Sequence, residues 1–96
     1  MWTAVLNGEV IATSDNTQEV EGNQYFPMDS IKTEFLSESS KTTVCPWKGT
    51  ANYFNLEING ETRPDSAWVY KTPKDAASNI AGHVAFGRDV QVTKAS

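Results

Sequence analysis

The sequence predicts a mainly β fold, and two patterns support this prediction. Two Asn-Gly pairs, Asn7-Gly8 and Asn59-Gly60, separate short apolar runs, and both residue types tolerate the positive φ of a two-residue hairpin turn. Apolar and polar residues alternate in Phe54-Asn55-Leu56-Glu57-Ile58, which is typical of a half-buried strand. We therefore expect a small antiparallel folded sheet or open barrel, with about seven to nine short strands and one or two short helices.

The first half of the chain is expected to form two hairpins. Residues 2–6 and 9–14 are the strands on either side of the first Asn-Gly pair. A second turn, at Gly22-Asn23, separates the strand candidates 17–21 and 24–27. These four strands account for most of the apolar residues before residue 28.

The segment 28–36 is ambiguous, because its apolar and charged residues follow no clean period. Asp29 or Ser30 is suited to open a short helix there. Residues 37–41, with the sequence SESSK, are expected to form a surface loop.

The second half of the chain contains further strand candidates and one predicted helix. Residues 51–58 and 61–63 flank the second Asn-Gly pair, and 67–70, 83–86 and 90–94 are short runs with β-type composition.

The predicted helix spans residues 72–82. Thr72 is suited to cap it, Pro73 fits its first position and Asp75 its first turn, while Gly82 ends it.

Composition narrows the possible functions. A chain of 96 residues has enough apolar surface for one core, so residues 1–96 are expected to form a single domain. The net charge is −4 and no basic block occurs, so we expect no nucleic-acid partner. The N-terminal residues resemble neither a signal peptide nor a membrane span. With a single cysteine and therefore no internal disulfide, a soluble cytoplasmic protein is expected.

The order of motifs resembles a family of small bacterial proteins, the domain-of-unknown-function family four-two-seven. The resemblance covers residues 2–92, and its most specific part is the run Cys45–Gly49 followed by Tyr53. A second specific part is Trp68 and Tyr70 ahead of Pro73. The resemblance implies a fold similar to the β-tent group, which includes methionine sulfoxide reductase B. It implies no activity, although the family carries a nominal nucleotidyltransferase-like label.

The residues argue against nucleotidyl transfer and against a metal site. Nucleotidyl transfer of the polymerase type needs convergent carboxylates on paired magnesium ions, and the sequence contains no Asp-x-Asp pair and no glycine-rich phosphate loop. Structural zinc sites need four ligands, whereas the chain has one cysteine and one histidine. We expect no metal and no cofactor, with a catalytic metal site of His83, Cys45 and one carboxylate as the alternative.

The Cys45–Gly49 run is expected to be a tight turn. Pro46 fixes φ, Gly49 permits a sharp bend, and Trp47 anchors the corner. The same turn is a candidate binding site, in which the ammonium of Lys48 faces a pocket and holds an anionic ligand. A solvated lysine in a turn is the alternative.

Aromatic side chains are expected to line that pocket. The candidates are Tyr25, Trp47, Trp68 and Tyr70, although aromatic residues at strand spacing are also typical of a core. The first hypothesis is thus a domain that binds a small molecule.

Two other functions stay open, so whether the chain is an enzyme is undecided. Cys45 is the candidate nucleophile of an enzyme, with His83 as its base, or else it is a small buried hydrophobic residue. The remaining possibility is an interaction module without a pocket, which binds a protein partner through a β edge or an aromatic patch.

Overall fold

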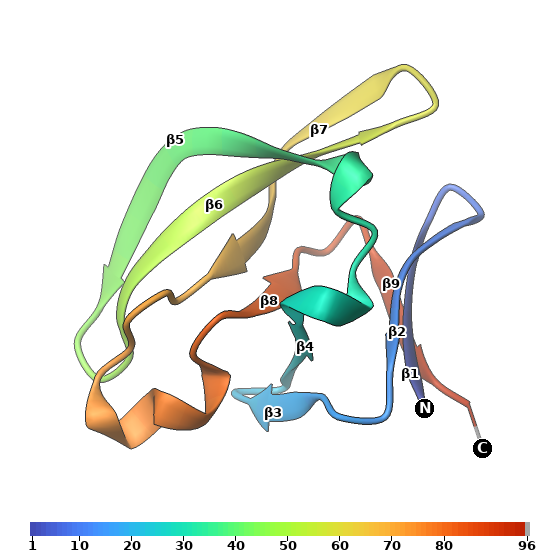
Figure 1. Ribbon diagram of the computed structural model, residues 1–96. Coiled ribbons are helices and arrows are strands. Elements are labelled where there is room, and N and C mark those ends of the chain that lie inside the picture. The colour runs from blue at the N-terminus through green and yellow to red at the C-terminus, as the bar shows by residue number, and fades with distance from the viewer. Residues whose placement is uncertain (96) are drawn as a thin grey trace.

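The computed structural model describes residues 1–95, and it is mainly β, as predicted (Figure 1). Nine antiparallel strands are present in these residues. They are β1 (Trp2–Leu6), β2 (Glu9–Ser14), β3 (Gln18–Val20), β4 (Asn23–Pro27), β5 (Leu36–Cys45), β6 (Gly49–Ile58), β7 (Glu61–Val69), β8 (His83–Phe86) and β9 (Gln91–Lys94).

The strands form two open sheets, and no closed barrel is present in the described chain. The smaller sheet has the order β2-β1-β9, and the larger has the order β3-β4-β8-β7-β6-β5. Figure 1 shows the smaller sheet at the right, beside the strongly curved β5–β6 hairpin and its neighbours. Every pairing between named strands is antiparallel.

Both Asn-Gly turns are confirmed. Asn7 and Gly8 have φ angles of 52° and 81°, and Asn59 and Gly60 have 54° and 79°. Positive φ at both central residues is the signature of the type I′ turn, whose twist matches that of antiparallel strands.

The larger sheet is apolar on both faces. Successive side chains of a strand point to opposite faces, and β7 and β8 carry apolar residues at consecutive positions. In β7, Ala67 and Val69 are buried in one core, whereas Trp68 packs against another. Their neighbours in β8 follow the same rule, since Phe86 pairs with Ala67 and Ala85 pairs with Trp68. Each face of this sheet therefore needs a cover.

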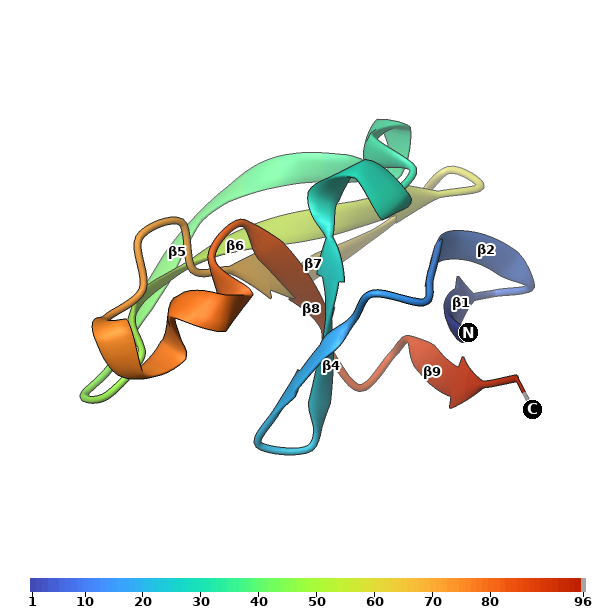
Figure 2. The same cartoon turned by 60° about the horizontal axis from the view of Figure 1, so that its bottom comes forward.

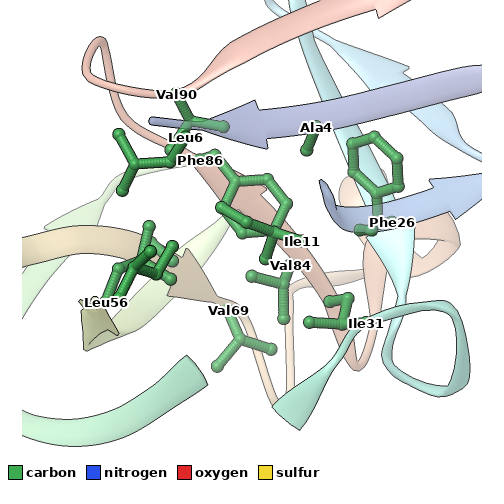
Figure 3. Close-up of a cluster of buried hydrophobic side chains, with 13 residues drawn as sticks. Ala4, Leu6, Ile11, Phe26, Ile31, Leu56, Val69, Val84, Phe86 and Val90 are labelled. Carbon is green, nitrogen blue, oxygen red and sulfur yellow. The ribbon is translucent and has the colours of Figure 1, made fainter. Parts of the chain in front are cut away.

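The smaller sheet covers the first face. Side chains of β1 and β2, such as Leu6 and Ile11, meet side chains of the larger sheet, such as Leu56 and Val84 (Figure 3). Phe86 and the fully buried Phe26 pack edge to face here, with ring centroids 5.6 Å apart. This is the larger of the two cores.

A short 3-10 segment, η3 (Asp75–Ile80), covers the second face. Its buried residues Ala77 and Ile80 pack with Tyr25, Ala51 and Tyr70. Figure 2 shows η3 on the opposite side of β8 from the smaller sheet.

The predicted helix over residues 72–82 is shorter and tighter in the structure. The Lys74 N–H donates to the Lys48 carbonyl in the β5–β6 turn, and the Gly82 N–H donates to the Tyr70 carbonyl just after β7, so both ends of the segment are tied to the larger sheet's connections. Only η3 coils between them, with non-helical angles at Ala77 and no side-chain cap, so Thr72 does not cap a helix. Between the two tethers the chain forms 3-10 turns interrupted at Ala77 rather than a regular α-helix.

Two single-turn 3-10 helices occupy the ambiguous region 28–36. They are η1 (Met28–Ser30) and η2 (Thr33–Phe35). The loop predicted at 37–41 is wrong, because these residues belong to β5. The sequence gives little strand signal there because β5 is an exposed edge strand whose side chains mostly face water.

Two bulges bend the larger sheet. The register of β5 against β6 shifts between Glu38 and Thr42, and that of β7 against β6 shifts opposite Asn55. Asp65 lies in the second irregular region with a positive φ of 55°, and Ser39 in the first donates a 2.5 Å hydrogen bond to its carboxylate. The bulges are thus linked across β6.

No helix in residues 1–95 has the length and apolar character needed to cross a membrane.

The two-core arrangement predicts a large difference between two identical substitutions. Val69 is 1% exposed and Val44 is 75% exposed. Val69→Ala should lower the free energy of unfolding by about 2 kcal/mol, because it removes buried methyl groups and leaves a cavity. Val44→Ala should change it by less than about 0.5 kcal/mol. Urea denaturation of both variants checks this, and equal midpoints would contradict the assignment of the core.

Candidate functional site

The Cys45–Gly49 run is the hairpin turn between β5 and β6. Cys45 pairs with Gly49 in register, and Gly49 has a φ of 109°, which favours glycine. The neighbouring chain holds the turn in place. The Lys74 N–H donates to the Lys48 carbonyl at 2.9 Å, and the Lys74 ammonium donates to the Pro46 carbonyl at 2.6 Å.

Lys48, rather than Trp47, is the side chain that this turn buries. The prediction that Trp47 anchors the corner is wrong, because its side chain is substantially exposed while Lys48 is buried. The Lys48 ammonium lies 5.5 Å from the Tyr70 ring centroid and 5.3 Å from that of Trp47, within the range of cation–π attraction. Lysine can be buried here because its ammonium contacts the rings of Trp47 and Tyr70 and a carboxylate.

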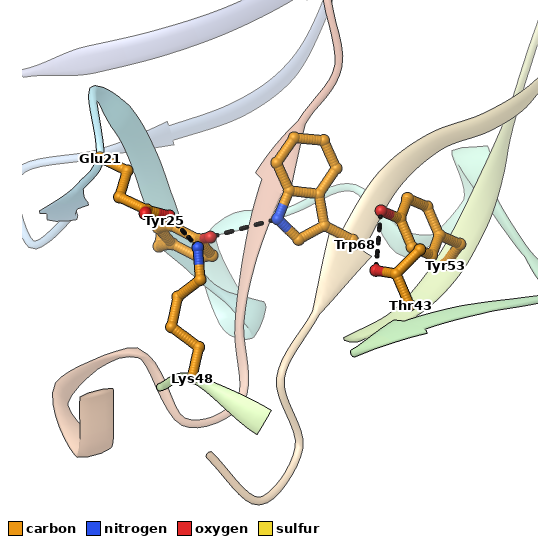
Figure 4. A network of polar contacts seen from close by, with 6 residues as sticks. All are labelled: Glu21, Tyr25, Thr43, Lys48, Tyr53 and Trp68. Atoms are coloured by element: carbon orange, nitrogen blue, oxygen red, sulfur yellow. Dashed lines mark hydrogen bonds and ion pairs between the residues drawn. The ribbon is translucent and has the colours of Figure 1, made fainter. Parts of the chain in front are cut away.

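Glu21 supplies that carboxylate (Figure 4). It forms an ion pair with Lys48 and is its only side-chain hydrogen-bond partner in residues 1–95. The Lys48 side chain is 8% exposed, whereas that of Glu21 is 51% exposed. The cation is therefore held inside the fold, and its counter-ion sits at the surface.

Glu21 reaches Lys48 from the turn between β3 and β4. Glu21 and Gly22 have φ angles of 54° and 79°, so the turn lies one residue earlier than the predicted Gly22-Asn23. Sequence reasoning missed Glu21 because glutamate rarely adopts positive φ. The glycine after it was the available signal, since Gly22 permits a two-residue turn at this position.

The ion pair shifts both titrations. Burial is the largest single influence on the pKa of Lys48 and lowers it. The hydrogen bond to Glu21 and the smaller electrostatic effects of Tyr25, Tyr70 and Glu21 together outweigh burial and raise the pKa above the ordinary value of 10.5. The same hydrogen bond lowers the pKa of Glu21 below its ordinary 4.5, with a smaller contribution from Trp47. Burial raises the pKa of the Tyr70 hydroxyl, and the positive charge of Lys48 opposes that rise. Lys48 is thus a cation throughout the neutral pH range.

The other predicted aromatic residues gather at the same place. Tyr25 is fully buried, and its ring centroid lies 6.4 Å from that of Tyr70. The indole N–H of Trp68 donates to the Tyr25 hydroxyl at 3.2 Å, and the Trp68 ring lies 5.9 Å from that of Tyr53 (Figure 4). We call Tyr25, Lys48, Trp68 and Tyr70 the lysine cluster.

Cys45 and His83 do not form a hydrogen-bonded pair. Cys45 is half-buried and packs against the second core. A His83 ring nitrogen lies 2.9 Å from the carbonyl of Ala81, two residues earlier. No hydrogen bond joins the thiol and the imidazole within the described chain, so the geometry of a nucleophile beside its base is not assembled.

Three surface hollows lie near the lysine cluster, and Lys48 lines none of them. The largest, about 520 Å³, is lined by Asn23, Trp68, Phe86, Gly87, Arg88, Val90 and Val92. Another of about 160 Å³ shares Asn23, Phe86 and Val92 with it, and a third of about 190 Å³ lies near Tyr53 and Lys71. Of the predicted ligand-binding residues, Trp68 lines one of these three hollows.

Histidine, cysteine and acidic side chains in residues 1–95 form no group of three that could hold a metal ion. What the lysine cluster can do chemically is offer one fixed cation between aromatic rings.

Comparison with protein families identifies the chain. The model of a family described as a domain of unknown function, DUF427, matches residues 1–95. The chain belongs to the DUF427 family. Among curated proteins, none matches its sequence. The DUF427 description specifies no activity.

The Glu21–Lys48 pair predicts a particular dependence of stability on pH. Because folding lowers the pKa of Glu21, its contribution is complete above 4.5 and is lost as pH falls through the folded-state pKa. The stability difference between the wild type and Glu21→Gln should therefore shrink across that acid range. Urea unfolding at a series of pH values measures it. Glu34→Gln, which removes an exposed carboxylate that makes no ion pair within residues 1–95, is the control. A gap that stays constant down to low pH would contradict the assignment.

Proposed function

We propose that this DUF427 protein binds a small anionic molecule, with the Lys48 ammonium as its recognition group. The observation that carries the proposal is the asymmetry of the ion pair. A cation with low exposure is held between aromatic rings, and the carboxylate that satisfies it belongs to an exposed turn residue.

The ammonium has capacity for a ligand. It carries three N–H donors, and Glu21 is its one side-chain hydrogen-bond acceptor among residues 1–95. In this proposal an incoming carboxylate or phosphate displaces Glu21, whose half-exposed side chain turns outward into water. The buried stem of Lys48 keeps the charge in place while this exchange occurs.

The aromatic surroundings favour a ligand with a flat or apolar body. The rings of Trp47 and Tyr70 flank the ammonium. A few fixed polar groups among aromatic side chains are the usual composition of small-molecule sites. Glu21 is, in this proposal, an internal stand-in for the anionic group of the ligand.

The lack of an internal disulfide, which follows from the single cysteine, supports a cytoplasmic location as part of the same proposal.

Anion titration of two variants tests the proposal. Glu21→Gln should bind acetate, benzoate or inorganic phosphate several-fold more tightly than the wild type, because the competing internal carboxylate is gone. Lys48→Met, which keeps an unbranched side chain but removes the ammonium, should lose the binding. Chemical shifts of the Lys48 ammonium and of the backbone amides of residues 45, 47–49 and 70 give the dissociation constants.

Lys32→Met and Glu34→Gln are the matched controls, since both residues are exposed. They change the net charge in the same directions and should bind each anion as the wild type does. If Glu21→Gln bound none of the three anions more tightly than the wild type, Lys48 would be a structural cation and the proposal would fail. This outcome stays informative even if Lys48→Met folds poorly.

A further inference from the structure

We propose that the groove of about 520 Å³ at the end of β8 is a second ligand site. In this proposal the protein binds a flat aromatic monoanion there through Arg88. This site is separate from the Lys48 ammonium and does not rest on the function proposed above. Its volume lies within the range of about 300–1,000 Å³ that is typical of small-molecule sites.

The groove is formed where the two sheets meet. Trp68 and Phe86 come from the larger sheet, and Val92 comes from β9 of the smaller sheet. Their apolar surfaces suit the face of an aromatic ring. Phe86 is fixed by its edge-to-face packing on Phe26, so this wall is part of the core rather than a mobile surface.

Arg88 is the one charged residue that lines this groove. It makes no ion pair within residues 1–95, although the chain carries more acidic than basic residues. Arg63, by contrast, contacts both Glu61 and Asp89. A guanidinium presents a planar set of N–H donors that matches a carboxylate.

The turn that carries Arg88 is anchored at both sides. The Gly87 N–H donates to the Ser66 carbonyl at 2.7 Å, and the Val90 N–H donates to the Gly87 carbonyl at 3.1 Å. Asp89 is held by Arg63 at 3.6 Å. The backbone is thus ordered before a ligand arrives, which lowers the entropy cost of binding.

The polar neighbours orient the ligand. The adjoining hollow of about 160 Å³ contains Glu19 and Gln24, and the Gln24 amide donates to the Glu19 carboxylate at 2.8 Å. An anionic group is disfavoured beside Glu19 and favoured beside Arg88. The ring of the ligand therefore lies along the partly exposed Trp68 and Val92, with its carboxylate toward Arg88.

Benzoate and its neutral analogue benzamide test this site by amide chemical-shift mapping on the full chain. Benzoate should shift the amides of Trp68 and of residues 86–92. Arg88→Gln should weaken its binding roughly fivefold, as expected for one partly exposed charge-assisted contact. Benzamide should bind the wild type correspondingly less tightly than benzoate does.

Lys32→Gln is the matched control, since it removes one exposed positive charge outside the groove. Equal benzoate affinity in Arg88→Gln and Lys32→Gln would overturn the proposal. Shifts confined to residues 45–49 and 70 would also overturn it, because benzoate would then bind at Lys48 alone. Groove amides that shift on dilution of the protein without benzoate would assign the groove to a second copy of the chain instead.

Discussion

The constraint on which this structure depends is that its six-stranded sheet is apolar on both faces. A sheet exposed on one side would leave either Phe86 and Val84 or Tyr25 and Tyr70 in water, at a cost of about 1.5–3 kcal/mol for each large side chain. The smaller sheet covers one face and η3 covers the other. The second cover is slight, since η3 has six residues, and the β5–β6 turn and the β3–β4 turn complete it.

The position of Lys48 follows from that incomplete cover. The β5–β6 turn closes over an aromatic surface that includes Tyr70. Of the two large side chains in this turn, the flexible Lys48 points inward and Trp47 stays exposed. A lone buried ammonium would be costly, so the fold supplies Glu21 from a turn in the left-handed region. The same turn, with positive φ at Glu21 and Gly22, carries the carboxylate that pairs with the ammonium. The same surface extends through Trp68, which links the Tyr25 hydroxyl to the groove beside Arg88.

The local features of this fold could be predicted from sequence, and the long-range ones could not. The Asn7-Gly8 and Asn59-Gly60 turns are set by their own residues, and the alternation around Leu56 is visible in one strand. The turn at Glu21-Gly22 puts a glutamate in the left-handed region, which glutamate rarely adopts, so residue preferences predicted the turn at Gly22-Asn23 instead.

The candidate site follows the same division. Aromatic composition and the resemblance to DUF427 predicted one site from Tyr25, Trp68, Tyr70 and Lys48. These four residues do lie close together in the structure. The inward position of Lys48 and its partner could not be predicted, because tryptophan is ordinarily the more buried residue of such a pair. The sequence did not predict residues 37–41 of β5 as a strand. Side chains there face water on both sides of the sheet, so the alternation of apolar and polar residues that marks a strand is absent.

The linked bulges have a consequence for how the chain behaves at high concentration. Strand β5 forms an outer edge of the larger sheet, and a straight edge is a template onto which another extended chain can add. The break in register between Glu38 and Thr42, which the Ser39–Asp65 hydrogen bond maintains, divides this ten-residue strand into two short stretches. Neither stretch offers the long flat row of donors and acceptors that fibre growth requires. The kink that shapes the sheet thus also shortens the template that this edge offers to another chain.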